Sequence, residues 1–318
     1  MTYNNRPPRR IVFMGSSDFS LASMAALQKG AFDIIGVYTQ PPKPSGRSYK
    51  VRKSPVQLFA EAQHLPVYTP TTLRNDEQRQ LLEKLHPDLV VVSSYGLIIP
   101  KNLLDIPTHG FINVHASLLP RWRGAAPIQM ALLAGDTRTG ITMMKMDPGL
   151  DTGDIIAVES LEITTGINAG TLSQKLAHLG ADLLLKTLEN LEENLASAVP
   201  QQEIGVTYAA KISPDSGRIN WDKSACDILK HILAFAPTPA AWGKINGLRL
   251  KIFDAEIGAG QTVDANQPGR LYIIEGDLWI SCGDGHLMLR EVQLEGKRRM
   301  SGREFCRGRP TIDGETLT

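Results

Sequence analysis

Two short stretches decide how the first part of the chain folds: DLVVVSS, residues 88–94, and GFINVH, residues 110–115. Both are mainly apolar runs of the kind found in parallel strands that are covered on both faces. Comparable runs on either side (RRIVFMG, FDIIGVYT, TGITMMKM, DIIAVESL) alternate with helical patterns. Helices are predicted over residues 19–29, 54–63, 76–85, 128–133 and 171–195. The alternation predicts an α/β fold, a Rossmann-like three-layer domain around a mostly parallel sheet.

The pattern changes near residue 207. Short strand-like runs follow, separated by Gly, Asp and Asn turns (LRLKIFDAEI, GRLYIIE, LWISC, LMLREVQL), with one helical pattern near residues 226–234. Such runs predict a small β-barrel or a β-sandwich, and of the two we expect an OB-like β-barrel. The length of 318 residues is sufficient for two domains. We therefore expect an α/β domain over residues 1–207 and a β-barrel domain over residues 208–318.

Composition excludes several classes of protein. No run of eighteen or more apolar residues is present, so no membrane span is expected. The basic N-terminal segment is followed by an apolar run too short for a signal peptide, and a cytoplasmic location is expected. Cys226, Cys282 and Cys306 are far apart and odd in number. This spacing argues against a disulfide framework or a structural zinc site, and we expect no metal.

The basic residues are unevenly distributed, although the net charge is only +1. Residues 1–53 contain nine Lys and Arg against two Asp and Glu, and residues 297–309 contain six against one. Clusters of this kind favour a polyanionic partner. The ordinary alternative is a charged surface that contacts only solvent.

Asn113 and His115 are candidate catalytic residues because they end a predicted buried strand. Residues two apart in a strand point to the same face, and the carboxyl ends of parallel strands form the ligand-binding crevice of α/β sheets. An amide N–H and an imidazole side by side can donate to one developing oxyanion, as acyl transfer requires. The imidazole can also move a proton near neutral pH. The alternative is a histidine with a purely structural role.

Asp151 lies in a Gly-rich acidic loop, MDPGLDTGDII, at residues 146–156. A carboxylate on such a loop can orient an imidazole by charge and hydrogen bonding. The alternatives are a polar turn and a calcium loop. The spacing lacks the ligand pattern and the final Glu of a calcium loop, which disfavours calcium.

The run NVHASLLPRWRGAAPIQ followed by MDPGLDTGD closely resembles the folate-dependent formyltransferase family. IVFMGSSDF, GVYTQPPKPSGR, SYGLIIP, TYAAKI and INWDKSA extend the resemblance over essentially the whole chain. The resemblance implies that Asn113, His115 and Asp151 are the catalytic residues. It also implies that a reduced folate contacts a further set of residues: Ser117, Leu118, Leu119, Pro120, Val92, Tyr95, Leu97 and Asp147.

The resemblance also implies a reaction. The donor would be 10-formyltetrahydrofolate, and the acceptor would be the α-amino group of methionine esterified to initiator tRNA, for translation initiation. Alternatives are transfer to glycinamide ribonucleotide or an amino-sugar nucleotide, hydrolysis to formate, and a binding protein without the chemistry. A small acceptor requires neither a basic insert nor an added barrel, so the tRNA acceptor is favoured. We expect a monomer.

The basic insert KPSGRSYKVRK, residues 43–53, is similar in place and sign to that of the family, with departures at Pro42, Ser48 and Tyr49. Phosphate contacts supply most of the affinity for a nucleic acid, so both basic clusters are candidates for tRNA binding. The candidates are Lys43, Arg47, Lys50, Arg52, Lys53, Lys297, Arg298 and Arg299. Arg121 and Arg123 are equally well interpreted as tRNA contacts or as braces of their loop, and Trp122 is interpreted as packed.

Overall fold

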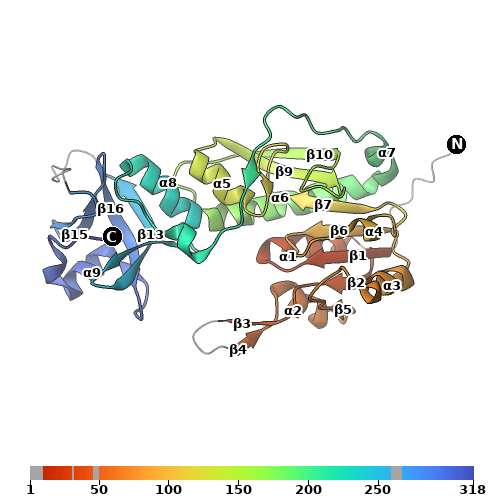
Figure 1. Cartoon of the computed structure of the whole chain (residues 1–318), viewed down its shortest axis with the longest axis horizontal. Helices are drawn as coiled ribbons and strands as arrows, with labels where there is room; N and C mark the ends of the chain where they lie inside the picture. Colours follow the sequence, from red (N-terminus) through yellow and green to blue (C-terminus); the bar gives the residue numbers. More distant parts are fainter. Residues whose placement is uncertain (1–9, 31, 46–49, 259–266) are drawn as a thin grey trace. The chain divides into compact units, whose positions relative to one another are not determined.

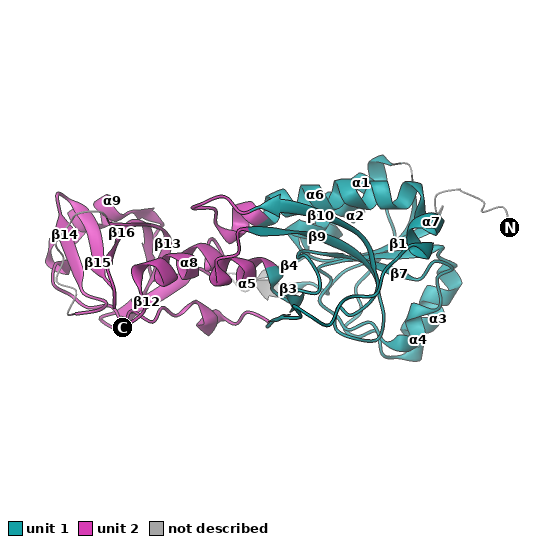
Figure 2. Ribbon diagram, turned by 90° about the horizontal axis from the view of Figure 1, so that it is seen from above, with its two compact units in different colours: residues 1–127, 138–162, 173–210 teal, residues 128–137, 163–172, 211–318 magenta. Residues whose placement is uncertain are grey.

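The computed structural model describes residues 10–30, 32–45, 50–258 and 267–318. The chain forms two compact units (Figure 2). Unit 1 comprises residues 1–127, 138–162 and 173–210, and unit 2 comprises residues 128–137, 163–172 and 211–318. The boundary of the two sequence domains near residue 207 stays a prediction.

Unit 1 is built on a seven-stranded sheet within the described residues, with strand order β10-β9-β7-β6-β1-β2-β5 (Figure 1). From β5 to β7 the neighbouring strands are parallel to one another, whereas β9 runs antiparallel to both of its neighbours, β7 and β10. The prediction of a mostly parallel α/β sheet is confirmed. The strands are β1 (Arg10–Gly15), β2 (Asp33–Tyr38), β5 (Val67–Tyr68), β6 (Leu89–Ser93), β7 (Phe111–His115), β9 (Arg138–Lys145) and β10 (Ile155–Glu162).

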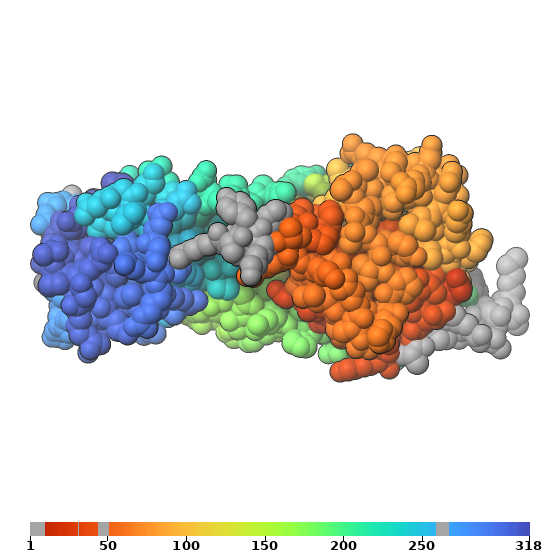
Figure 3. All heavy atoms as spheres, turned by 90° about the horizontal axis from the view of Figure 1, so that it is seen from below, coloured from red at the N-terminus to blue at the C-terminus, as the bar shows by residue number. Residues whose placement is uncertain are grey.

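Helices cover the buried apolar side chains of this sheet. Those of unit 1 that match predicted segments are α1 (Asp18–Lys29), α2 (Pro55–Ala62) and α3 (Asp76–Leu85), and the short α4 (Lys101–Leu104) was not predicted. In the space-filling view of Figure 3, the orange segment that contains α2 and α3 forms the outer layer of unit 1 on that side. Helix α6 packs closely on the sheet, since a Cβ added at Gly180 would lie 3.0 Å from the Val114 side chain.

The prediction of one continuous helix over residues 171–195 is wrong. The structure has α6 (Ala169–Glu189) followed by a separate α7 (Leu191–Ala196). Asn190 between them has φ −128°, and the side-chain amide of Asn194 donates to the Thr187 carbonyl at 2.9 Å. This side-chain bond satisfies a carbonyl at the end of α6, where the helix can no longer do so.

Unit 2 contains an antiparallel sheet with strand order β12-β13-β16-β15-β14, to which β17 is added beside β16. The last residues of the chain close it. Thr318 and Lys244 exchange two backbone hydrogen bonds of 2.7 and 2.9 Å, and the Leu317 amide donates to the Gly269 carbonyl at 2.8 Å. The predicted β-barrel is confirmed. Its strands are β12 (Ala241–Ile245), β13 (Leu248–Ile257), β14 (Leu271–Ile274), β15 (Asp277–Ser281), β16 (His286–Leu294) and β17 (Met300–Ser301).

Short elements complete the two units. Unit 2 also contains the helices α5 (Pro127–Ala134, of which Pro127 belongs to unit 1), α8 (Ala225–Phe235) and α9 (Gly302–Gly308) and the 3₁₀ turns Pro214–Gly217 and Pro310–Ile312. Unit 1 also contains the strand pairs β3 (Lys43–Ser45) with β4 (Lys50–Arg52) and β8 (Arg123–Gly124) with β11 (Tyr208–Ala209). None of the described helices is both long and apolar enough to cross a membrane.

The burial of the cysteines in unit 2 predicts how fast their thiols react. Cys226 is exposed, whereas Cys282 and Cys306 are buried. Burial raises the pKa of Cys282 to about 12 and that of Cys306 to about 11. Because the thiolate is the reactive form, we expect only Cys226 to react quickly with a thiol reagent at pH 8, and all three to react in denaturant. A second fast thiol in the native protein would contradict this packing.

Candidate active site

Strand β7 delivers Asn113 and His115 to the site. It pairs with β6 on one side and with β9 on the other, so its backbone is fixed from both sides. The two side chains point to the same face because they are two residues apart. Asn113 is half-buried, and only 5% of the His115 side chain is exposed. Both polar groups therefore lie in a largely water-excluded place.

Asp151 lies in the loop between β9 and β10, and its backbone is in the left-handed region at φ 51°. Gly153 allows the loop to turn back on itself, since a Cβ there would lie 1.7 Å from the Lys145 carbonyl oxygen. The Asp147 carboxylate accepts hydrogen bonds from the Thr152 hydroxyl at 2.7 Å and from the Gly149 amide at 3.0 Å. The loop is thus held by its own side chains in one shape.

The Asp151 carboxylate joins the three predicted catalytic residues. One oxygen, Oδ1, accepts from Asn113 Nδ2 at 3.2 Å. The other, Oδ2, accepts from the Gly124 amide at 2.8 Å and lies 3.7 Å from His115 Nδ1. His115 Nε2 is 3.0 Å from the Trp122 carbonyl oxygen. A carbonyl can only accept, so Nε2 carries a hydrogen, and Nδ1 is the ring nitrogen that faces Asp151.

The loop that follows β7 is tied to β9 and to residues near 207. Thr142 donates from its hydroxyl to the Ser117 carbonyl at 2.7 Å and accepts from the Leu119 amide at 3.1 Å. The Trp122 amide, in a residue with φ 64°, donates to the Thr207 hydroxyl at 2.9 Å. These bonds fix the carbonyl that faces His115.

The residues predicted to bind folate lie on three separate segments. Val92 and Tyr95 are buried at the end of β6, and Leu97 is half-buried in the same apolar cluster as Met146. Among the described residues, the Tyr95 hydroxyl has no hydrogen-bond partner, and burial raises its pKa above the usual range. Ser117, Leu118, Leu119 and Pro120 follow β7, and Asp147 closes the loop after β9. Their folate contacts stay predictions.

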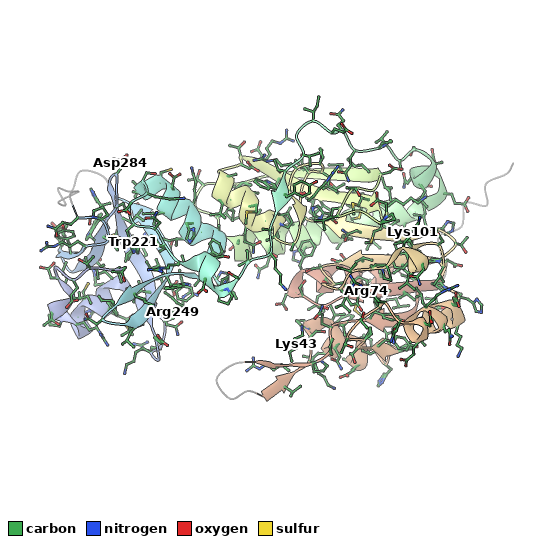
Figure 4. The ribbon with its side chains drawn as sticks, in the orientation of Figure 1. Lys43, Arg74, Lys101, Trp221, Arg249 and Asp284 are labelled. Atoms are coloured by element: carbon green, nitrogen blue, oxygen red, sulfur yellow. The ribbon has the colours of Figure 1, made fainter. Side chains whose placement is uncertain are left out.

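The basic insert forms the hairpin β3–β4, which extends from the sheet of unit 1 (Figure 1). Lys43, labelled in Figure 4, faces Arg52 across the hairpin and donates to Gln40 Oε1 at 2.7 Å. Lys53 pairs with Glu61 at 2.8 Å. Lys50 lies on β4, and Arg47 lies outside the described residues.

The second basic cluster in unit 2 is largely paired. Arg298 lies 3.3 Å from Glu304, and Arg299 pairs with Glu291 while its guanidinium stacks 4.0 Å from the Phe253 ring centroid. Lys297 is exposed. The roles of all three residues in tRNA binding stay predictions.

Sequence reasoning missed three residues that hold the site together: Gly124, Gln201 and Thr207. Gly124 has φ 120°, and a Cβ there would lie 2.5 Å from the Ala209 carbonyl oxygen. Arg123 donates from Nε to Gln201 Oε1 at 3.0 Å, so its side chain acts as a brace. The pairing of β8 with β11 is only two residues long and leaves no periodic pattern in the sequence. The one available signal was the glycine after Arg123.

Comparison with known proteins places the fold and site in a family. Residues 9–188 match the family model described as formyl transferase, and residues 211–310 match that of the formyl transferase C-terminal domain. The chain belongs to the formyl transferase family.

Two curated relatives match the chain over nearly its whole length. The chain is 43% identical to a protein of Magnetococcus marinus over 97% of this chain and 98% of the relative. It is 41% identical to a protein of Rhodopseudomonas palustris over 96% and 98%. Both are named methionyl-tRNA formyltransferase. The fold also resembles the N-formyltransferase from Helicobacter canadensis in complex with folinic acid and dTDP-3-aminofucose, with TM-score 0.65 and 20% identity over 88% of this chain and 98% of that one.

The close approach at Gly124 leads to a stability prediction. Gly124→Ala adds a Cβ against Ala209 at a backbone angle that costs an L residue about 1–2 kcal/mol or more. We expect calorimetry to place the melting temperature of unit 1 lower by about 5 °C or more. The matched control is Gly205→Ala, which also has positive φ (85°) but has no atom within 4 Å of the added Cβ. Equal losses in the two variants would show that the Ala209 contact has no effect on stability.

Proposed function

We propose that this protein transfers the formyl group of 10-formyltetrahydrofolate to the α-amino group of methionine esterified to initiator tRNA. The observation that carries the proposal is the identity of 43% and 41% to two proteins named methionyl-tRNA formyltransferase, over nearly the whole of each chain. The identity extends across both domain models rather than the catalytic part alone. A cytoplasmic location and a monomeric state belong to the same proposal.

The chemistry of the site supports group transfer to an amine. Asn113 Nδ2 has two N–H groups, of which one is bound to Asp151, so the second can donate to the formyl oxygen as negative charge develops on it. His115, between the Trp122 carbonyl and the Asp151 carboxylate, is held to give or take a proton. Asp151 faces Nδ1 of the imidazole and keeps the ring oriented. Acylation of the chain itself is not required.

The residues near the end of β6 fit a reduced folate. 10-Formyltetrahydrofolate supplies the formyl group, and its ring system has polar edges. Val92, Leu97 and Met146 supply apolar side chains, and the buried Tyr95 hydroxyl, unpaired among the described residues, is a donor without a protein acceptor. We assign these residues, with Ser117–Pro120 and Asp147, to the binding of the donor.

The hairpin β3–β4 supports a polyanionic acceptor. Lys43 and Arg52 face each other, and like charges directly opposite destabilise a strand pair. A phosphate backbone beside the hairpin would offset that repulsion. We assign Lys43, Arg47, Lys50 and Arg52 to the acceptor tRNA. Lys53 and the cluster Lys297–Arg299 contribute less in this proposal, because their charges are mostly balanced by Glu61, Glu304 and Glu291.

Transfer to a small amine is not favoured. The N-formyltransferase from Helicobacter canadensis shares the fold at only 20% identity, which carries no substrate assignment. The two relatives at 41–43% identity cover the C-terminal domain as well. Hydrolysis to formate likewise has no specific observation in its favour.

The proposal is tested by an assay with 10-formyltetrahydrofolate and competing acceptors. The acceptors offered together are initiator methionyl-tRNA, glycinamide ribonucleotide, an amino-sugar nucleotide and water. We expect rapid transfer to the charged tRNA and negligible transfer to the others. Fast transfer to a small amine, or formate release without any acceptor, would overturn the assignment of the acceptor.

His115→Ala is the control for the chemistry in the same assay. The variant removes the proton-transfer group from a site in which it is 5% exposed. We expect transfer to fall by at least about 10², with tRNA affinity unchanged, because the imidazole does not lie on the hairpin. Equal loss of binding and transfer would contradict the separation of chemistry from recognition.

The hairpin assignment predicts a change in salt dependence. Arg47→Gln, Lys50→Gln and Arg52→Gln together remove three positive charges. We expect weaker tRNA binding, and a plot of log affinity against log salt that is less steep by about 2–3 units. Lys53→Gln is the matched control, with a smaller effect because Glu61 already balances Lys53. Unchanged affinity and slope in the triple variant would exclude the hairpin as a tRNA contact.

A further inference from the structure

Residues 199–209, here called the strap, lie along both loops that form the site. At the start of the strap, Val199 and Ile155 exchange backbone hydrogen bonds of 2.8 and 2.9 Å. At its end, Thr207 and β11 bind the Trp122–Gly124 segment. The strap thus connects the loop that carries Asp151 to the loop that carries the Trp122 carbonyl.

Gln201 is the polar side chain of the strap that reaches Asp151. Its amide nitrogen donates to the Asp151 carbonyl at 2.8 Å and to the Gly153 carbonyl at 2.8 Å. Its amide oxygen accepts from Arg123 Nε at 3.0 Å. The half-buried side chain thus uses both of its N–H groups and its oxygen. A side chain placed only by surface solvation would not be saturated in this way.

These contacts close a ring of interactions around the Asp151 carboxylate. Gln201 holds the backbone of Asp151, the carboxylate of Asp151 binds the Gly124 amide, and Arg123, next to Gly124, returns to Gln201. The two carbonyls that face Gln201 would repel each other without a shared donor. Asp151 has φ 51°, a conformation that persists only where the surroundings hold it. Loss of the amide donors would therefore let the carboxylate move away from His115.

We propose that Gln201 is a positioning residue for the transfer reaction, acting through Asp151 on His115. It does not touch the reacting atoms. The inference rests on the proposed function for its effect on turnover, whereas its effect on the geometry of His115 does not depend on the substrate.

Gln201→Glu is the decisive variant, because it keeps the length of the side chain and the contact with Arg123. It replaces both N–H donors with an oxygen that faces two carbonyls. We expect kcat to fall by up to about 10²-fold, with KM for the donor and for the tRNA within about twofold. Gln201→Ala is the second variant, for the case in which Gln201→Glu does not fold.

Gln202 offers a matched control. It is the adjacent residue of the strap and is exposed. Gln202→Glu makes the same change in net charge, so it corrects for repulsion of a polyanionic acceptor. We expect wild-type kcat and KM for Gln202→Glu, with a melting temperature within about 2 °C of the wild type, and a lower melting temperature for Gln201→Glu, which loses two hydrogen bonds.

The ring nitrogens of His115, observed by NMR after ¹⁵N-histidine labelling, provide a readout without substrate. We expect their signals to shift in Gln201→Glu and to stay in place in Gln202→Glu. A KM effect with unchanged kcat, unchanged His115 signals, or shifted signals with wild-type kcat would each overturn the role. If the wild type itself did not formylate methionyl-tRNA, the proposed function would fail, and the His115 signals alone would decide whether Gln201 positions Asp151.

Discussion

The site depends on one shared, nearly buried carboxylate. Asp151 is 13% exposed, and burial of a charge is costly unless donors surround it. Here the donors are the side-chain amide of Asn113 and the backbone N–H of Gly124, and the His115 imidazole lies 3.7 Å from the carboxylate. The carboxylate therefore joins the strand that carries Asn113 and His115 to the loop that carries Gly124.

The fold brings these groups together from distant parts of the sequence. Strand β7 supplies Asn113 and His115, and the β9–β10 connection supplies Asp151. The strap after α7 binds this connection and the Trp122–Gly124 segment that follows β7. Two glycines make the approach of the backbones possible, because a side chain at Gly153 or Gly124 would overlap a neighbouring carbonyl. Because β9 runs antiparallel to β7 and β10, the loop between β9 and β10 lies beside the end of β7.

Much of this fold and part of the site could be predicted from sequence. Apolar runs such as residues 89–92 indicate buried strands, because burial stabilises apolar side chains whichever residues cover them. Asn113 and His115 stand out because packing alone does not account for them. The break at Asn190 and the contacts of Gln201 could not be predicted, since both depend on carbonyls that only the folded chain brings near these side chains. The two-residue strands β8 and β11 are too short for any periodicity.

The sequence also does not show which charged side chains are paired in the folded chain. A count of Lys and Arg makes the segment after residue 296 as basic as the hairpin β3–β4, yet Arg298 and Arg299 are paired with glutamates. In the hairpin, Lys43 binds the neutral Gln40 and faces Arg52, so its positive charge is not balanced within that contact. Since paired charges contribute little to the field at a distance, a count of Lys and Arg overstates the attraction that Arg298 and Arg299 exert on a polyanion. The proposed recognition of the acceptor therefore rests on charge in a short hairpin whose Lys43 binds a neutral partner, whereas the Asp151 carboxylate is held by hydrogen bonds from Asn113 and from the Gly124 amide.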